Sequence, residues 1–60
     1  MMDEALMTSE EVAAWLRVSQ PTLCRWRKEG RGPRVYWLTD FCPRYRRSDV
    51  QEWLNGQVAA

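Results

Sequence analysis

Two helix-start signals stand so close together in this sequence that the helices they begin must meet at a tight corner. The segment Thr8–Glu11 has the spacing of a capping box, in which hydroxyl and carboxylate each bond an amide that the first turn leaves unpaired. The segment Ser19–Pro21 begins a second helix, with serine as the cap and proline in the first turn. We therefore predict helices over about residues 9–17 and 20–29, joined at apolar Val18. So short a connection favours a sharp angle, typical of a helix-turn-helix unit.

The chain after the second predicted helix changes from helix formers to turn and strand formers. Gly30–Pro33 has turn chemistry, and the β-forming run 35–38 follows it. An irregular tip then separates this run from residues 44–47, which can return as the second strand of a hairpin. A two-stranded hairpin is hardly stable alone, so we expect Leu38 and Tyr45 to anchor it on the helices.

A third helix is predicted near the end of the chain. Ser48 and Gln51 repeat the capping-box spacing at its start. Each of the three helices carries one tryptophan in its apolar stripe, and we expect Trp15, Trp26 and Trp53 to converge on one aromatic core. Such a core would let so few residues fold without a disulfide or a metal. The prediction is one domain over residues 1–60, ordered over about 6–56 and frayed after that.

The charges of the chain are sorted along its length. All nine Lys and Arg lie between Arg17 and Arg47, with only Glu29 and Asp40 opposing them, while both flanks are acidic and the formal net charge is +1. A chain that sorts its charge in this way is expected to fold with one positive face.

Several classes of function are disfavoured by what the sequence lacks. There is no His, so the commonest metal ligand and the usual general base near neutral pH are both missing. No apolar run approaches the roughly 20 residues of a membrane helix, and nothing resembles a signal peptide. Cys24 and Cys42 stand eighteen positions apart without a CxxC motif and are interpreted as ordinary thiols in a reducing compartment. We predict a soluble cytoplasmic protein that is not an enzyme and has no cofactor, metal, membrane or small-molecule ligand.

The second predicted helix presents a basic outer face. At 100° per residue Leu23 and Trp26 share the inner side, and Arg25 and Lys28 lie opposite them. The plain alternative is a solvated surface with no further role. The first turn, however, adds an amide and a hydroxyl, from Gln20 and Thr22, that can read base edges or bind phosphate. We therefore predict that this face contacts nucleic acid.

The order of these segments resembles a known family. The run VSQPTLCRWRKEG, a Gly-Pro turn, a short hairpin and then RYRRSDVQEWL are similar to the excisionase and MerR-like winged helix-turn-helix group of small phage and mobile-element proteins, over about residues 6–56. The resemblance implies a mainly α fold with three helices and a two-stranded wing, the second helix entering the major groove of DNA. By position it assigns the recognition helix Gln20, Thr22, Arg25, Arg27 and Lys28, and the wing Arg34, Arg44 and Arg46.

Two departures from the family's pattern affect these assignments. Arg27 stands where the family usually has an apolar residue, so either it crosses the edge of the core or the helix is rotated. The wing tip, TDFCP, lacks the glycine and arginine that such wings often carry. Because phosphate would repel Asp40, we expect the tip to avoid DNA and the strand arginines to make the contacts of the wing. Phe41 could act as a wedge or cover the core, and we expect it to cover the core.

The function that the resemblance implies is that of an excisionase, or recombination directionality factor. Such a protein loads cooperatively beside an attachment site, bends the DNA and helps an integrase to excise. Its partners would be double-stranded DNA, an integrase and further copies of itself. One alternative is a small transcriptional regulator of the same fold that controls excision or integration genes. Another is a protein-interaction adaptor, which an exposed Trp37 and Phe41 would support.

Overall fold

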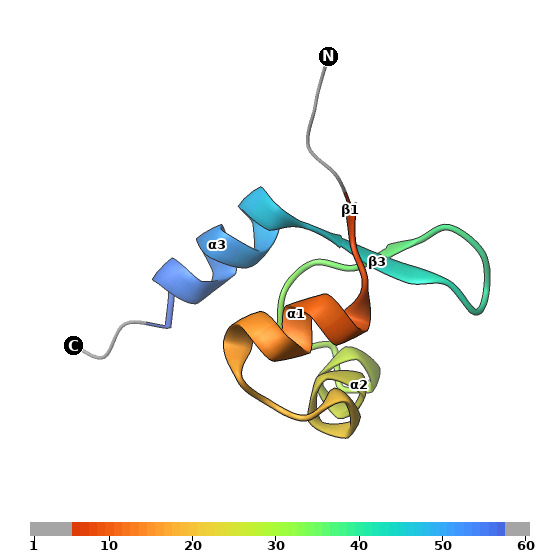
Figure 1. The fold of residues 1–60 in the computed structure, drawn as a ribbon, viewed down its shortest axis with the longest axis horizontal. Coiled ribbons are helices and arrows are strands. Elements are labelled where there is room, and N and C mark those ends of the chain that lie inside the picture. The colour runs from red at the N-terminus through yellow and green to blue at the C-terminus, as the bar shows by residue number, and fades with distance from the viewer. Residues whose placement is uncertain (1–5, 58–60) are drawn as a thin grey trace, which may run out of the picture.

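A computed structural model describes residues 6–57 of the chain and shows three helices packed on a small antiparallel sheet (Figure 1). In chain order the elements are β1 (Leu6–Met7), α1 (Ser9–Leu16), α2 (Gln20–Lys28), β2 (Tyr36–Trp37), β3 (Pro43–Arg46) and α3 (Arg47–Asn55). Helices α1 and α2 form a helix-turn-helix unit, and β2 and β3 form a wing. The wing and α3 lie at opposite ends of the view in Figure 1. The predicted winged helix-turn-helix fold is confirmed.

The starts of α1 and α2 are set by the two local signals that the sequence shows. The Glu11 amide donates to Thr8 Oγ1 at 3.1 Å, and the Thr8 amide donates to Glu11 Oε1 at 2.9 Å, so the capping box is complete. Ser19 Oγ accepts from the amide of Thr22 at 3.2 Å and caps α2. Between the helices Arg17 adopts a left-handed backbone with φ of 61°. This residue turns the chain at the corner.

The sheet contains a strand that the sequence did not indicate. Strand β3 lies in the middle and pairs with β1 on one side and with β2 on the other. Leu6 lies opposite Arg46 and Met7 opposite Tyr45 in the first pair. The wing is therefore part of a three-stranded sheet rather than an isolated hairpin. A two-residue strand such as β1 is too short to show an alternating pattern, which is why it was missed.

The centre of the core is built from four aliphatic side chains and one tyrosine. The buried hydrophobic residues are Val12, Ala13, Leu23, Tyr45 and Val50. The predicted anchoring role of Tyr45 is confirmed, whereas Leu38 is 55% exposed and anchors nothing. The predicted aromatic core is confirmed only in part. Trp26 and Trp53 pack on each other with ring centroids 5.6 Å apart, and Trp15 and Trp26 pack against the core, but all three tryptophans are half-buried. An indole group is too large to be enclosed fully in a core of this size.

Helix α3 begins two residues earlier than its sequence signal suggests, at Arg47 rather than Asp49. Strand β3 continues directly into α3 at Arg47, and the N-cap residue Arg46 makes no side-chain cap hydrogen bond. The predicted Ser48–Gln51 capping box is therefore wrong. The start of α3 is tied instead to β2, because the Tyr36 hydroxyl donates to Asp49 Oδ2 at 2.8 Å.

Among residues 6–57, no helix combines the length and apolarity needed to cross a membrane. Of the tail expected to fray, residues 58–60 lie outside the described residues.

Candidate nucleic-acid interface

The outer face of α2 carries the side chains best placed to meet a nucleic acid. Gln20, Arg25 and Lys28 are exposed on this helix, while Leu23 is only 1% exposed on the opposite side. Thr22 is half-buried, and its hydroxyl oxygen accepts from the Ser19 hydroxyl at 2.9 Å within the cap. The face is therefore outward and basic as expected. Its contact with DNA stays a prediction.

Arg27 is turned inward, unlike the other cations of α2. Its Nη1 donates to the hydroxyls of Ser9 and Tyr45, both at 3.1 Å. Its guanidinium carbon also lies 5.5 Å from the ring centroid of Trp37. Of the two sequence alternatives, the structure shows the first: Arg27 crosses the edge of the core and connects α2 with α1 and the wing. These contacts within the domain make Arg27 a positioning residue, and its predicted DNA contact becomes the least supported of the set.

The contact between Arg27 and Tyr45 can be measured by a double-mutant cycle with Arg27→Met, Tyr45→Phe and the double variant. Tyr45→Phe keeps the buried ring and removes the acceptor, so we expect it to lower the free energy of unfolding by about 1–2 kcal/mol. Urea unfolding followed by tryptophan fluorescence gives the values. We expect the double variant to lose less than the sum of the single losses. Strict additivity would show that the two side chains do not interact in solution.

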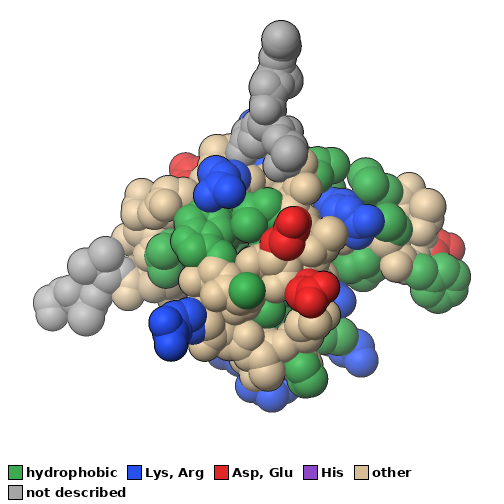
Figure 2. Space-filling view, viewed as in Figure 1, with side chains coloured by type: hydrophobic (Ala, Val, Ile, Leu, Met, Phe, Trp, Pro, Cys, Tyr) green, Lys and Arg blue, Asp and Glu red, His purple; other side chains and the backbone are tan. Residues whose placement is uncertain are grey.

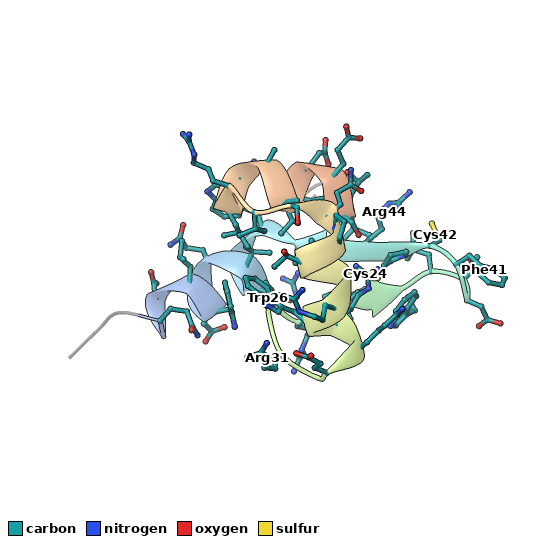
Figure 3. All side chains as sticks on the ribbon, turned by 90° about the horizontal axis from the view of Figure 1, so that it is seen from below. Cys24, Trp26, Arg31, Phe41, Cys42 and Arg44 are labelled. Carbon is teal, nitrogen blue, oxygen red and sulfur yellow. The ribbon has the colours of Figure 1, made fainter. Side chains whose placement is uncertain are left out.

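The wing arginines are distributed differently from the cations of α2. Arg34 is exposed in the segment before β2, and Arg46 is exposed at the end of β3. Arg44 is half-buried, and its Nη1 donates to the carbonyl oxygen of Pro43 at 2.8 Å. Tyr45 faces Arg27 of α2, so strand alternation points Arg44 and Arg46 away from α2. Figure 3 shows Arg44 on the side of the wing where α1 lies.

The structure has the geometry of a helix-turn-helix domain. Three residues join α1 to α2, the outer face of α2 is exposed and basic, and a wing adjoins the two helices. A family model described as "Helix-turn-helix domain" matches residues 6–58 of the chain. The chain belongs to this helix-turn-helix family. The family binds DNA, includes excisionase-like proteins and is typically non-enzymatic. No curated protein and no solved structure matches the chain.

On the side of the domain shown in Figure 2, the cations do not form one continuous patch. In the view of Figure 2 the Lys and Arg side chains stand apart, and several follow the lower edge, where Figure 1 places α2. Arg31 pairs with Glu29 at 2.8 Å, and the guanidinium carbon of Arg47 lies 5.3 Å from the Trp15 ring centroid. The prediction of a single positive face is therefore not confirmed on the side that Figure 2 shows. Charges that are neighbours in sequence are separated because residues 17–47 pass through a helix, a loop and both strands of the wing.

The tip of the wing carries exposed apolar side chains. Phe41 is 93% exposed, so the expectation that it covers the core is wrong. Trp37 and Leu38 are also exposed, each by more than half. The Cys42 amide donates to the Thr39 carbonyl at 3.2 Å, and this tight reversal leaves Phe41 at the turn with nothing packed over it. The sequence signal for this surface was the run of apolar residues on both sides of Asp40.

The metal-ligating side chains of the described residues lie apart from one another. Over residues 6–57 no three His, Cys, Asp or Glu side chains gather in a way that could hold a metal ion. Cys24 and Cys42 are both half-buried and free.

Proposed function

We propose that this chain is an excisionase of a phage or another mobile element. It binds DNA sequence-specifically and cooperatively near attachment sites, bends the DNA and promotes integrase-mediated excision. Its partners are double-stranded DNA, an integrase and adjacent copies of itself, and it acts as one domain in the cytoplasm of a bacterial host. The observation that carries the proposal is the exposed basic face of α2 in a family that includes excisionase-like proteins.

Sequence is read by α2 in this proposal. A helix fits the major groove of B-DNA, which is about 12 Å wide. The first turn of α2 enters the groove with Gln20, whose amide can pair with adenine, and Thr22 stands beside it. Arg25, one turn further on, can bond the two acceptors of a guanine edge. Lys28 at the end of the helix meets a phosphate as a point charge.

The wing supplies phosphate contacts in this proposal. Arg34 is exposed in the loop that follows α2 and can bind a phosphate of the DNA backbone that flanks the groove. Arg44 and Arg46 point to the other side of the sheet, so they reach a phosphate only where the DNA bends around the wing. Contacts of this kind contribute affinity that falls with salt and carry no sequence information.

Cooperative loading follows from the small size of the domain. A single module of this kind buries about 600–1,000 Å² on DNA, which gives modest affinity. Adjacent copies that touch one another raise occupancy without any new DNA contact. The proposal therefore includes self-association on DNA.

The decisive experiment is a recombination assay with a cognate integrase and a plasmid that carries both of its attachment sites. We expect excision with integrase plus this chain and little excision with integrase alone. Arg25→Ala, which leaves the core untouched, should abolish the stimulation. Equal excision with and without the chain would contradict the excision role. If the chain then still binds a specific site, transcriptional regulation would take its place.

A further inference from the structure

Two surfaces on opposite sides of α2 take no part in the proposed contact with DNA. The first is an open hollow of about 460 Å³ between α2, α3 and the loop that follows α2, and we call it the tryptophan hollow. Its lining residues are Trp26, Gly30, Arg31, Gly32, Trp53 and Gln57. The second is the wing tip, residues 38–41, at the far end of the molecule. Figure 3 shows Trp26 and Arg31 on one side of α2 and Phe41 at the opposite extreme.

The tryptophan hollow has an aromatic wall and a cationic rim. The rings of Trp26 and Trp53 lie 5.6 Å apart at 45°, and both are half-buried. Gly32 holds the loop against this wall, because a Cβ there would lie 3.3 Å from the Cβ of Trp26. Arg31 stands at the rim, where its Nε and Nη2 meet the same Glu29 oxygen. A guanidinium has five N–H donors, so most of them remain available to a second carboxylate.

The wing tip has the complementary chemistry. Phe41 presents a whole aromatic ring to solvent, and Leu38 extends this apolar surface. Asp40 lies next to Phe41 and is also exposed, so the tip joins one ring to one carboxylate. The Asp40 carboxylate makes DNA an unfavourable partner for the wing tip, because the phosphates would repel it. An aromatic pocket with an arginine at its rim fits this combination better than DNA does.

We propose that the wing tip of one copy docks into the tryptophan hollow of the next. The Phe41 ring packs on Trp26 and Trp53 within the range of centroid distances that aromatic pairs prefer. The Asp40 carboxylate meets the free donors of Arg31. This inference rests on the proposed self-association and names the surfaces that carry it.

The docking is head-to-tail. Tip and hollow are different surfaces on opposite sides of α2, so each pair of copies leaves one tip and one hollow unfilled. Such a contact adds copies in one direction and does not close on itself after two. Arg25 and Lys28 do not line the hollow, so α2 stays available to DNA in every copy. Linked copies would therefore share one orientation along the duplex and favour direct repeats over inverted ones.

The test uses Phe41→Ser, which removes the exposed ring, and Arg31→Asp, which reverses the charge at the hollow. On a duplex with two direct-repeat sites, we expect the unaltered chain to bind with a cooperativity factor on the order of 10 and each variant to bind with a factor near 1. Affinity for a single-site duplex should change less than about 2-fold in Phe41→Ser, because this residue is uncharged and lies away from the outer face of α2. The cooperativity factor of Arg31→Asp is taken relative to its own single-site affinity, because reversing a charge near DNA lowers affinity for every site. Circular dichroism melts establish that both variants are folded.

Mixing the two variants distinguishes head-to-tail docking from other contacts. Phe41→Ser keeps an intact hollow, and Arg31→Asp keeps an intact tip. In the mixture, the tip of an Arg31→Asp copy can therefore dock into the hollow of a Phe41→Ser copy, and cooperativity on two sites should return. The remaining tip and hollow of that pair are both altered, so cooperative binding should not extend to a third site. The double variant Asp40→Arg, Arg31→Asp should regain it on three. If Arg31→Asp alone binds as cooperatively as the unaltered chain, the contact between copies does not use the hollow and the proposal is overturned.

Other results would also overturn the docking. Loss of single-site affinity in Phe41→Ser would show that the ring enters DNA. Absence of cooperativity in the unaltered chain, with specific single-site binding intact, would contradict the docking but not the proposed DNA recognition.

In sedimentation measurements without DNA, concentration-dependent association that both variants lose would support the docking even if the chain bound no specific site.

Discussion

Replacing Leu23 with alanine is expected to remove about half of the stability of the domain. Leu23 is 1% exposed and lies in the core with Val12, Tyr45 and Val50. A buried Leu→Ala change costs about 2–5 kcal/mol, because the cavity closes only in part. A domain of this length is stable by about 3–9 kcal/mol. Urea unfolding followed by tryptophan fluorescence measures the loss.

The matched control for this experiment is Leu54→Ala on α3. The substitution is the same, but Leu54 is 38% exposed and lies outside the buried core. We expect it to cost less than about 1 kcal/mol, since partial exposure leaves less apolar area to lose. Equal losses from the two variants would contradict the core described above.

Replacing Arg25 with alanine is expected to remove most of the preference for a specific DNA site. Loss of one bidentate base contact costs about 1–3 kcal/mol, which corresponds to roughly 5- to 150-fold in the ratio of specific to non-specific affinity. The duplex is one selected by the unaltered chain from a random pool, and a scrambled duplex gives the non-specific affinity. Stability should change by less than about 0.5 kcal/mol, because the side chain is exposed and lies away from the core.

Arg47→Ala is the control for this loss of preference. It removes the same type of side chain at the start of α3, where the guanidinium lies over Trp15 and not on the outer face of α2. We expect its specificity ratio to stay close to that of the unaltered chain. A ratio that survives Arg25→Ala would show that Arg25 does not read the site.

The elements that the sequence predicts best are those whose signals are local. The starts of α1 and α2 are set by Thr8 and Ser19, whose partners lie three residues away. The start of α3 was misplaced because it depends on β3 running directly into the helix and on Tyr36, thirteen positions from Asp49. Strand β1 exists only through its pairing with β3. A pattern within one segment cannot report pairing between segments.

The candidate site shows the same division between local and distant signals. The outward face of α2 follows from helical periodicity, and the structure exposes Arg25 and Lys28 there. The direction of Arg27 depends on Ser9 and Tyr45, each eighteen positions away, and periodicity alone could not choose between its alternatives. The exposure of Phe41 likewise depends on how the tip of the wing reverses.

Strand β3 has a mechanical consequence for the whole domain. It holds β1 through one edge and β2 through the other, and it passes without a loop into α3. The hydroxyl of its buried Tyr45 also accepts a hydrogen bond from Arg27 of α2. A load applied to the wing, whether by a bent duplex or a neighbouring protein, would therefore be transmitted through four residues to every other part of the molecule. We expect the whole domain to unfold in a single step under force, rather than the wing to detach and unfold before the helices.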